Sequence, residues 1–184
     1  MNYEYTFVII RPGGIKRRLI TYIYTSLMDA CLEVEAWKIG MVTKAQLDEH
    51  YEHIKTAYPD KYEEMVAEML SGESLFLLLS GEGAVKKVRD MLGHWNPEIA
   101  KGENPYSIRS LYGNPVIFSD NIMHASDSEE NALVEFERFF GMDIDCFKDM
   151  ASEKANEKIN EEANFNYMKV LGKVRALYKE SVTS

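Results

Sequence analysis

The sequence of 184 residues has only two cysteines and no long run of apolar residues. Cys31 and Cys146 lie far apart among apolar neighbours, so we expect both to be reduced core residues of a cytoplasmic protein. No basic stretch followed by an apolar one opens the chain, and we expect no secretion signal. The most apolar run, residues 75–79, is far shorter than the ~18 residues of a membrane span, so it predicts a buried strand.

Positive charge is also scarce, with 21 Lys and Arg residues against 30 Asp and Glu and a formal net charge of −9. This balance argues against binding to nucleic acid or to an anionic membrane surface, since both require a broad basic face. It leaves open an anionic small ligand, because such a ligand needs only a local cluster of cations.

Strand-like and helix-like patterns alternate along the chain, which predicts an α/β sandwich. Strands are predicted at residues 6–10, 34–41, 75–79 and 116–118. Helices are predicted at residues 19–31, 43–54, 59–71 and 84–92. Thr43 and Gln46 form a capping box, and Gly72 and Gly93 are the expected C-caps of the last two helices. Residues 94–114 are polar, and we expect them to form a long functional loop.

A change of composition marks the last part of the chain. From about Ser152 onward Glu, Lys, Asn and Ala dominate and proline is absent, which predicts a long helix. We therefore expect a main domain over residues 1–150 and a helical extension over residues 151–184. Apolar residues between positions 163 and 182 recur at about 3.5-residue spacing, so the extension is expected to pack on its own domain, on a sister subunit or on another protein.

The segment Asn121-Ile-Met-His124-Ala-Ser126-Asp127-Ser128 places a histidine between an apolar run and a helix start. Imidazole is neutral and nucleophilic near pH 7, so it can accept a group covalently if a neighbour orients the ring. Glu135 flanks the apolar face of the following helix and is predicted to accept the Nδ1–H of His124, which would leave Nε2 free to attack. The alternative is a surface glutamate and a histidine satisfied near a helix cap.

Other local patterns carry less information. The chain has no G-x-x-x-x-G-K-[ST] sequence, so a P-loop is excluded. His50 and His53 lie one helical turn apart beside Glu49 and Glu52, which allows a metal site. A solvated acidic helix face is the favoured interpretation of these four residues.

Four segments together resemble the nucleoside diphosphate kinase family, in the same order as in that family. They are Thr6-Phe-Val-Ile-Ile-Arg11-Pro-Gly-Gly, Arg89-Asp-Met-Leu-Gly-His-Trp-Asn-Pro97, Tyr106-Ser-Ile-Arg109, and the His124 segment with Glu135 downstream. The resemblance implies a ferredoxin-like βαββαβ fold with an antiparallel sheet, followed here by a C-terminal helix. It also implies a ping-pong reaction, in which a nucleoside triphosphate gives its γ-phosphoryl group to the histidine and a nucleoside diphosphate takes it away.

The resemblance further implies Mg²⁺ carried mainly by the nucleotide phosphates, and a homo-oligomer that is a dimer, tetramer or hexamer. The implied catalytic residues are His124, Glu135, Ser126, Arg11 and Tyr51. The implied nucleotide-binding residues are Arg11, Arg89, Trp95, Arg109, Phe118, Asn121 and Tyr62. Asn121 matches the residue that binds the ribose 3′-hydroxyl, and Asp127 is either a water-mediated Mg²⁺ contact or, preferably, a helix cap.

The sequence departs from the family at several of these positions. Arg11 replaces a lysine near the transferred phosphoryl group, Trp95 replaces a threonine that contacts phosphate, and Ala125 replaces a glycine. The resemblance does not align the base-stacking aromatic cleanly, and we expect it to be Tyr58 or Tyr62, with Phe118 lining the other side of the base. These changes motivate an alternative function, a weakly active kinase-like module that serves as a nucleotide- or protein-binding scaffold.

Overall fold

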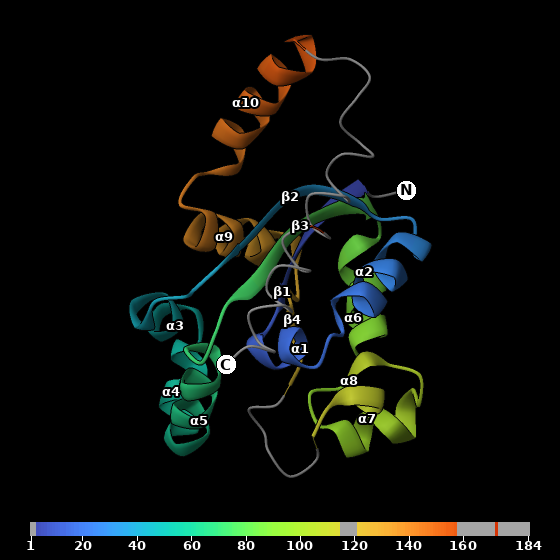
Figure 1. Ribbon diagram of the computed structural model, residues 1–184, viewed down its shortest axis with the longest axis vertical. Coiled ribbons are helices and arrows are strands. Elements are labelled where there is room, and N and C mark those ends of the chain that lie inside the picture. Colours follow the sequence, from blue (N-terminus) through green and yellow to red (C-terminus); the bar gives the residue numbers. More distant parts are fainter. Residues whose placement is uncertain (1–2, 115–120, 158–171, 173–184) are drawn as a thin grey trace. The chain divides into compact units, whose positions relative to one another are not determined.

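The computed structural model describes residues 3–114, 121–157 and Gly172 (Figure 1). The chain divides into two compact units, Met1–Gly141 and Met142–Ser184. The described helix of the second unit is α10 (Ile144–Glu157), which runs across the predicted boundary after residue 150. That boundary and the packing role of the extension stay predictions, since residues 163 and 170, like most of the expected apolar stripe, lie outside the described residues.

The first unit is built on a four-stranded antiparallel sheet with the order β2-β3-β1-β4. The strands are β1 (Tyr3–Ile10), β2 (Glu33–Gly40), β3 (Ser74–Glu82) and β4 (Met123–Ala125). This order, with helices in the connections, is that of the ferredoxin-like fold, so the predicted fold is confirmed. The three longer strands fall where the sequence predicted them, because β-branched and apolar runs form buried strands.

Helices of this unit bury apolar faces in its core. The longer ones are α2 (Ile20–Asp29), α5 (Pro59–Met69), α6 (Ala84–Leu92) and α9 (Glu129–Phe140). Both α6 and α9 contact the central strand β1. The core between β1, β3 and α9 contains a stack of three rings, in which Phe139 lies 5.7 Å from Phe7 and 5.4 Å from Phe76 between ring centroids. Central strand and α9 are thus locked together beneath the site described below.

Short helices fill segments where the sequence predicted none or one continuous helix. They are α1 (Pro12–Lys16), α3 (Lys44–His50), α4 (Glu52–Ala57), α7 (Pro97–Glu103) and α8 (Ile108–Tyr112). The Thr43 capping box is confirmed at the start of α3, but the predicted helix breaks at Tyr51. The predicted long loop at residues 94–114 is wrong, because the Asn96 and Ser107 side chains accept bonds from backbone N–H groups and start α7 and α8 there.

Three smaller predictions also fail. Gly72 does not cap α5, because the helix ends at Met69 and its C-cap is Leu70, with φ −83°. Cys31 and Cys146 are free but exposed rather than core residues. Cys31 has φ 58° and lies in the exposed turn before β2. Gly93 does cap α6, with φ 81°, as predicted.

The predicted strand at residues 116–118 lies outside the described residues. Among the residues that the structure does describe, no helix is both long and apolar enough to cross a bilayer.

Candidate active site

His124 occupies the middle of β4, an edge strand of the sheet, opposite Ile9 of β1. Directly after this strand the Ser128 side chain accepts the backbone N–H of Asn131 at 3.1 Å and starts α9. The preference for Asp127 as the cap is therefore wrong by one residue. Asp127 instead accepts a bond from the Asn131 side chain at 2.6 Å, which lowers the pKa of its carboxyl group.

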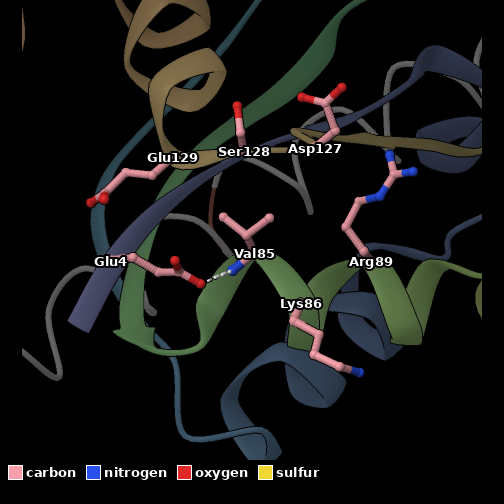
Figure 2. A pocket seen from close by; sticks show the side chains of 7 residues that line it. All are labelled: Glu4, Val85, Lys86, Arg89, Asp127, Ser128 and Glu129. Carbon is pink, nitrogen blue, oxygen red and sulfur yellow. Dashed lines mark hydrogen bonds between the residues drawn. The ribbon is translucent and has the colours of Figure 1, made fainter. Parts of the chain in front are cut away.

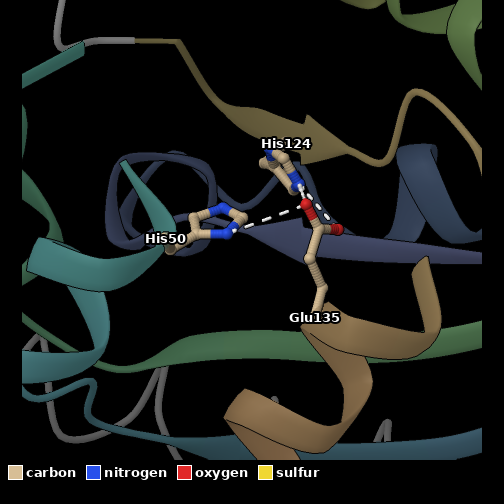
Figure 3. Close-up of side chains that lie close together, drawn as sticks. All are labelled: His50, His124 and Glu135. Atoms are coloured by element: carbon tan, nitrogen blue, oxygen red, sulfur yellow. Dashed lines mark hydrogen bonds and ion pairs between the residues drawn. The ribbon is translucent and has the colours of Figure 1, made fainter. Parts of the chain in front are cut away.

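The ring of His124 is held by the carboxylate of Glu135, which reaches back from α9 (Figure 3). Nε2 of His124 lies 3.1 Å from both Oε1 and Oε2 of Glu135. The hydroxyl of Ser126 donates to Oε2 of the same carboxylate. Glu135 is 7% exposed and Ser126 is 1% exposed, so these two side chains are shielded from water. Hydrogen bonds in such a buried environment are stronger than in water.

The predicted ring orientation is wrong in this structure. A carboxylate can only accept, so the neutral ring must carry its proton on Nε2. The lone pair then resides on Nδ1, which is the nitrogen left for nucleophilic attack. The sequence could place Glu135 near the ring, but the ring rotamer depends on packing that has no sequence signal.

His50 joins this network, contrary to its predicted place on a solvated helix face. It ends α3, is 8% exposed, and its Nδ1 lies 3.7 Å from Oε1 of Glu135. Its ring centroid is 4.6 Å from that of His124. His53 does lie on an exposed face, as predicted. The missed signal was the three-residue spacing of His50 from the buried Leu47, which places both residues on one face of α3.

Cationic side chains from different elements gather near this network. Arg11, which precedes α1, is 5% exposed and donates from Nη2 to the Tyr51 hydroxyl at 3.0 Å. Arg109 of α8 is 8% exposed and donates to the backbone oxygens of Gly93 at 2.9 Å and Met123 at 3.5 Å. Burial, and then the charges of Arg11 and Arg89, lower the pKa of Arg109 to about 9. Guanidinium groups keep their proton in proteins, so the lowered pKa indicates that the Arg109 charge is destabilised by burial and by neighbouring cations. A bound anion would reduce this destabilisation.

Arg89 lies on the exposed side of α6, and its Nη1 donates to the Ala125 backbone oxygen at 3.4 Å. Figure 2 shows Arg89 reaching toward the segment that carries Asp127. Both residues line an open hollow of about 490 Å³, together with Glu4, Val85, Lys86, Ser128 and Glu129. The hollow is of mixed charge, since both basic and acidic side chains line it. One of the acidic groups, the Glu4 carboxylate, accepts the Val85 N–H at 3.0 Å.

Asn121 and Trp95 are linked at the other end of β4. The Nδ2 of Asn121 donates to the Trp95 backbone oxygen at 3.4 Å. Asn121 is 6% exposed, and its Oδ1 has no hydrogen-bond partner among the described residues. The Trp95 side chain is 49% exposed. Phe118 lies outside the described residues, so its predicted position beside a base stays a prediction.

The two tyrosines proposed to stack on a base differ sharply in exposure. Tyr62 is 1% exposed and its hydroxyl donates to Asp48 at 2.6 Å, so its ring has no free face and the prediction for Tyr62 is wrong. Tyr58 is 60% exposed. The Lys61 ammonium lies 5.4 Å from the centroid of Tyr58 and 5.9 Å from that of Trp95. Tyr58 and Trp95 are therefore two exposed rings that approach the same ammonium group and could stack on a base.

The chain is similar to known proteins over most of this first unit. Residues 4–144 match the family model described as nucleoside diphosphate kinase. The nucleoside diphosphate kinase of Bdellovibrio bacteriovorus is 36% identical over 141 residues, which cover 76% of this chain and 94% of the relative. That of Methanocaldococcus jannaschii is 34% identical over 140 residues, 76% of this chain and 95% of the relative.

Solved structures show the same likeness. The apo nucleoside diphosphate kinase of Encephalitozoon cuniculi has a TM-score of 0.69 and 35% identity, and covers 77% of this chain and 91% of that chain. The enzyme of Halobacterium salinarum in complex with CDP has a TM-score of 0.68 and 28% identity, and covers 77% of this chain and 90% of that chain.

Proposed function

The chain belongs to the nucleoside diphosphate kinase family, and we propose that it carries the γ-phosphoryl group of a nucleoside triphosphate on His124 before passing it to a nucleoside diphosphate. The observation that carries this proposal is the contact of His124 Nε2 with both oxygens of the buried Glu135, at 3.1 Å. That contact leaves Nδ1 with its lone pair. The weakly active scaffold is not the favoured reading, because the relatives that match over nine-tenths of their length are nucleoside diphosphate kinases.

The first half-reaction makes one bond and breaks one. The Nδ1 lone pair of His124 attacks the γ-phosphorus, an N–P bond forms, and the bond from phosphorus to the β-phosphate oxygen breaks with its electron pair on the departing diphosphate. Glu135 stabilises the positive charge that develops on the ring, and Ser126 fixes the carboxylate by donating to it. The second half-reaction is the reverse, with a terminal oxygen of the acceptor diphosphate attacking phosphohistidine.

Phosphoryl transfer demands mostly positioning and neutralisation of charge on the phosphate oxygens. Arg109 and Arg11 are buried cations, and Arg89 is close enough to influence the pKa of Arg109. We assign these guanidinium groups to the phosphates, because their planar forks match pairs of phosphate oxygens. Tyr51 would orient Arg11 through its hydroxyl, and the Oδ1 of Asn121 is an acceptor suited to a ribose hydroxyl.

Members of this family generally need a divalent metal, and we propose Mg²⁺ bound mainly by the nucleotide phosphates. His50, His124 and Glu135 offer three donor atoms within 4.8 Å of one another, but two imidazoles do not suit Mg²⁺, which prefers oxygen ligands. Asp127 fits better, since its lowered pKa keeps the carboxylate ionised beside Arg89 and able to hold a hydrated ion through water. When bound, the metal would neutralise charge on the phosphates.

The direct test is a pulse and chase. The purified protein is incubated with γ-labelled ATP and Mg²⁺, denatured or chased with excess GDP, and mapped by peptide analysis. We expect acid-labile, alkali-stable label on His124 that moves to GTP within seconds. Label on another residue, or transfer to GDP without any labelled protein intermediate, would contradict the proposal.

We further propose that the nucleobase stacks on Trp95, with Tyr58 nearby. Both rings are about half exposed or more and approach the same Lys61. Stacking on an aromatic ring does not distinguish one base from another, so the enzyme is expected to accept several bases. This position moves the base platform away from the buried Tyr62.

Tryptophan fluorescence tests the base platform, because Trp37 on β2 is the other tryptophan of the chain. We expect added ADP to quench the wild type and Trp37→Phe alike, and to leave Trp95→Ala unchanged. Base–aromatic stacking contributes about 1–3 kcal/mol, so Trp95→Ala should raise the Kd for ADP by roughly 5–150-fold. Equal ADP affinity in Trp95→Ala and the wild type would rule out this platform.

Assembly and location are proposals of a different kind. We propose a homo-oligomer, a dimer, tetramer or hexamer, on the resemblance to the family. The two free, exposed cysteines suit the reducing cytoplasm.

A further inference from the structure

His50 is a buried titratable residue that the reaction described above does not use. Its side chain is 3% exposed and ends α3, one residue before Tyr51. Three rings enclose it, with centroids at 4.2 Å for Tyr51, 4.6 Å for His124 and 5.2 Å for Phe139. A buried imidazole carries a desolvation cost, so its retention beside the nucleophile calls for a physical reason.

The polar contacts of His50 tie it to the partner of the nucleophile. Its Nδ1 lies 3.7 Å from Oε1 of Glu135 and 3.5 Å from Nη1 of Arg138, whose Nη2 is paired with Glu49 at 2.9 Å. A guanidinium can only donate, so this contact places the lone pair of His50 on Nδ1 and its proton on Nε2. Nε2 is buried without a hydrogen-bond partner among the described residues. The ring is thus held by packing and by the polar contacts of Nδ1 alone.

The surroundings of His50 disfavour its protonation. Burial is the largest cause that holds its pKa well below the usual range, followed by the positive charges near it. The titratable and charged groups that face it are His124, Arg138, Arg11, His53, Glu135 and Tyr51. A protonated His50 would form an ion pair with Glu135 and draw its charge away from His124.

A transition-metal site is the competing interpretation, because two imidazoles and one carboxylate are ligands that zinc accepts. The charges argue against it. Arg11 and Arg138 are cations that disfavour a proton on His50. They would also repel a dication bound between the two imidazoles and the carboxylate. Zinc binding is therefore kept as an outcome of the test.

We propose that His50 is a positioning residue: a neutral ring that packs edge-on against His124, prevents that ring from turning over, and leaves the Glu135 carboxylate to Nε2 of His124. The interplanar angle of 77° between the two imidazoles is the geometry that blocks rotation. Figure 3 shows both rings and the carboxylate meeting from three different elements. The role in catalysis rests on the proposed function, because it matters only if Nδ1 is the nucleophile.

The test combines a rate, an affinity and the protonation state of His124. Without the His50 ring, His124 can rotate and present either nitrogen to Glu135. We expect His50→Ala to slow phosphohistidine formation by about 10–100-fold with ATP affinity within threefold of wild type, since small misplacements cost rate rather than binding. ¹⁵N NMR of the free protein should show His124 protonated at Nε2 in the wild type, and a mixture of Nε2–H and Nδ1–H forms in His50→Ala.

His53→Ala is the matched control, because His53 is exposed one turn further along the chain. It should match the wild type in all three measurements. Wild-type rate and a single Nε2–H form in His50→Ala would overturn the proposal. So would stoichiometric binding of Zn²⁺ alone that the wild type shows and His50→Ala loses. If the wild type takes no label at all, the proposed function fails, and the ¹⁵N measurement still decides the positioning role.

A second measurement keeps the proposal testable if His50→Ala does not fold. In the wild-type protein, the ¹⁵N shifts of His50 should stay those of a neutral ring as the pH falls through ~6.5, the ordinary imidazole pKa, because burial and the nearby positive charges hold the pKa of His50 well below that value. The unfolded chain takes up a proton at His50 that the folded protein refuses, so this residue lowers stability as the pH falls below ~6.5. Ordinary titration of His50 in the folded protein would overturn the proposal.

Discussion

Replacing His124 with alanine is expected to abolish phosphoryl transfer while leaving the sheet intact. Without the imidazole no covalent intermediate can form, and the turnover should fall by roughly 10⁴-fold or more. His124 lies on a three-residue edge strand and its side chain is 16% exposed, so the loss of packing should cost only about 1–3 kcal/mol of unfolding free energy. Stopped-flow transfer from ATP to GDP gives the rate, and urea unfolding gives the stability.

His53→Ala is again the control, since it removes an exposed imidazole from α4. It should retain the wild-type rate. Turnover by a folded His124→Ala protein at more than a hundredth of the wild-type rate would mean that the phosphoryl group travels by another route.

Replacing Glu135 with glutamine is expected to reduce transfer by about 10²–10⁴-fold without loss of nucleotide affinity. Glutamine keeps the shape but not the charge, so the positive charge that develops on His124 loses its counter-ion. Its amide can also donate to the ring and favour the tautomer with the proton on the wrong nitrogen, an effect known to be severe when an amide replaces a carboxylate behind a catalytic histidine. The Ser126 hydroxyl would lose its charged acceptor at the same time.

Glu137→Gln provides the matched control, because Glu137 is exposed on the same helix two residues further on. Both variants should bind ADP with wild-type affinity, as measured by calorimetry. Only Glu135→Gln should accumulate phosphohistidine slowly. A rate within tenfold of wild type would show that the charge of Glu135 is not needed.

The strands β1 and β3 were predictable from sequence because they are continuous apolar runs, whereas the three-residue strand β4 was not predicted as a strand. The apolar runs of β1 and β3 are short and are followed by glycine-containing segments, which favours strands over helices, and the glycine after α6 marked its end. The segment at residues 94–114 was missed because its helices are short and polar. Their start signals, Asn96-Pro97 and Ser107, are local hydrogen-bond geometries that a search for apolar periodicity passes over.

The candidate site likewise combines residues that the sequence could place with contacts that it could not. The resemblance placed His124, Glu135 and Ser126 in one network, which the structure contains. His50 was missed because its burial results from α3 packing on α9, a contact between residues 88 positions apart. The ring orientation of His124 and the burial of Tyr62 likewise depend on rotamers and long-range packing, and neither leaves a pattern in a single sequence.

The position of His124 on an edge strand affects how the protein loses activity under mild destabilisation. β4 bonds to β1 along one edge, whereas β1 is flanked on both sides and fixed by the ring stack of the core. Amide protons at the edge should therefore exchange with solvent through local openings that leave the remaining strands closed. Mild heat or denaturant would then inactivate the protein while its circular dichroism spectrum stays native. A loss of activity under these conditions would indicate local fraying of β4 rather than unfolding of the molecule.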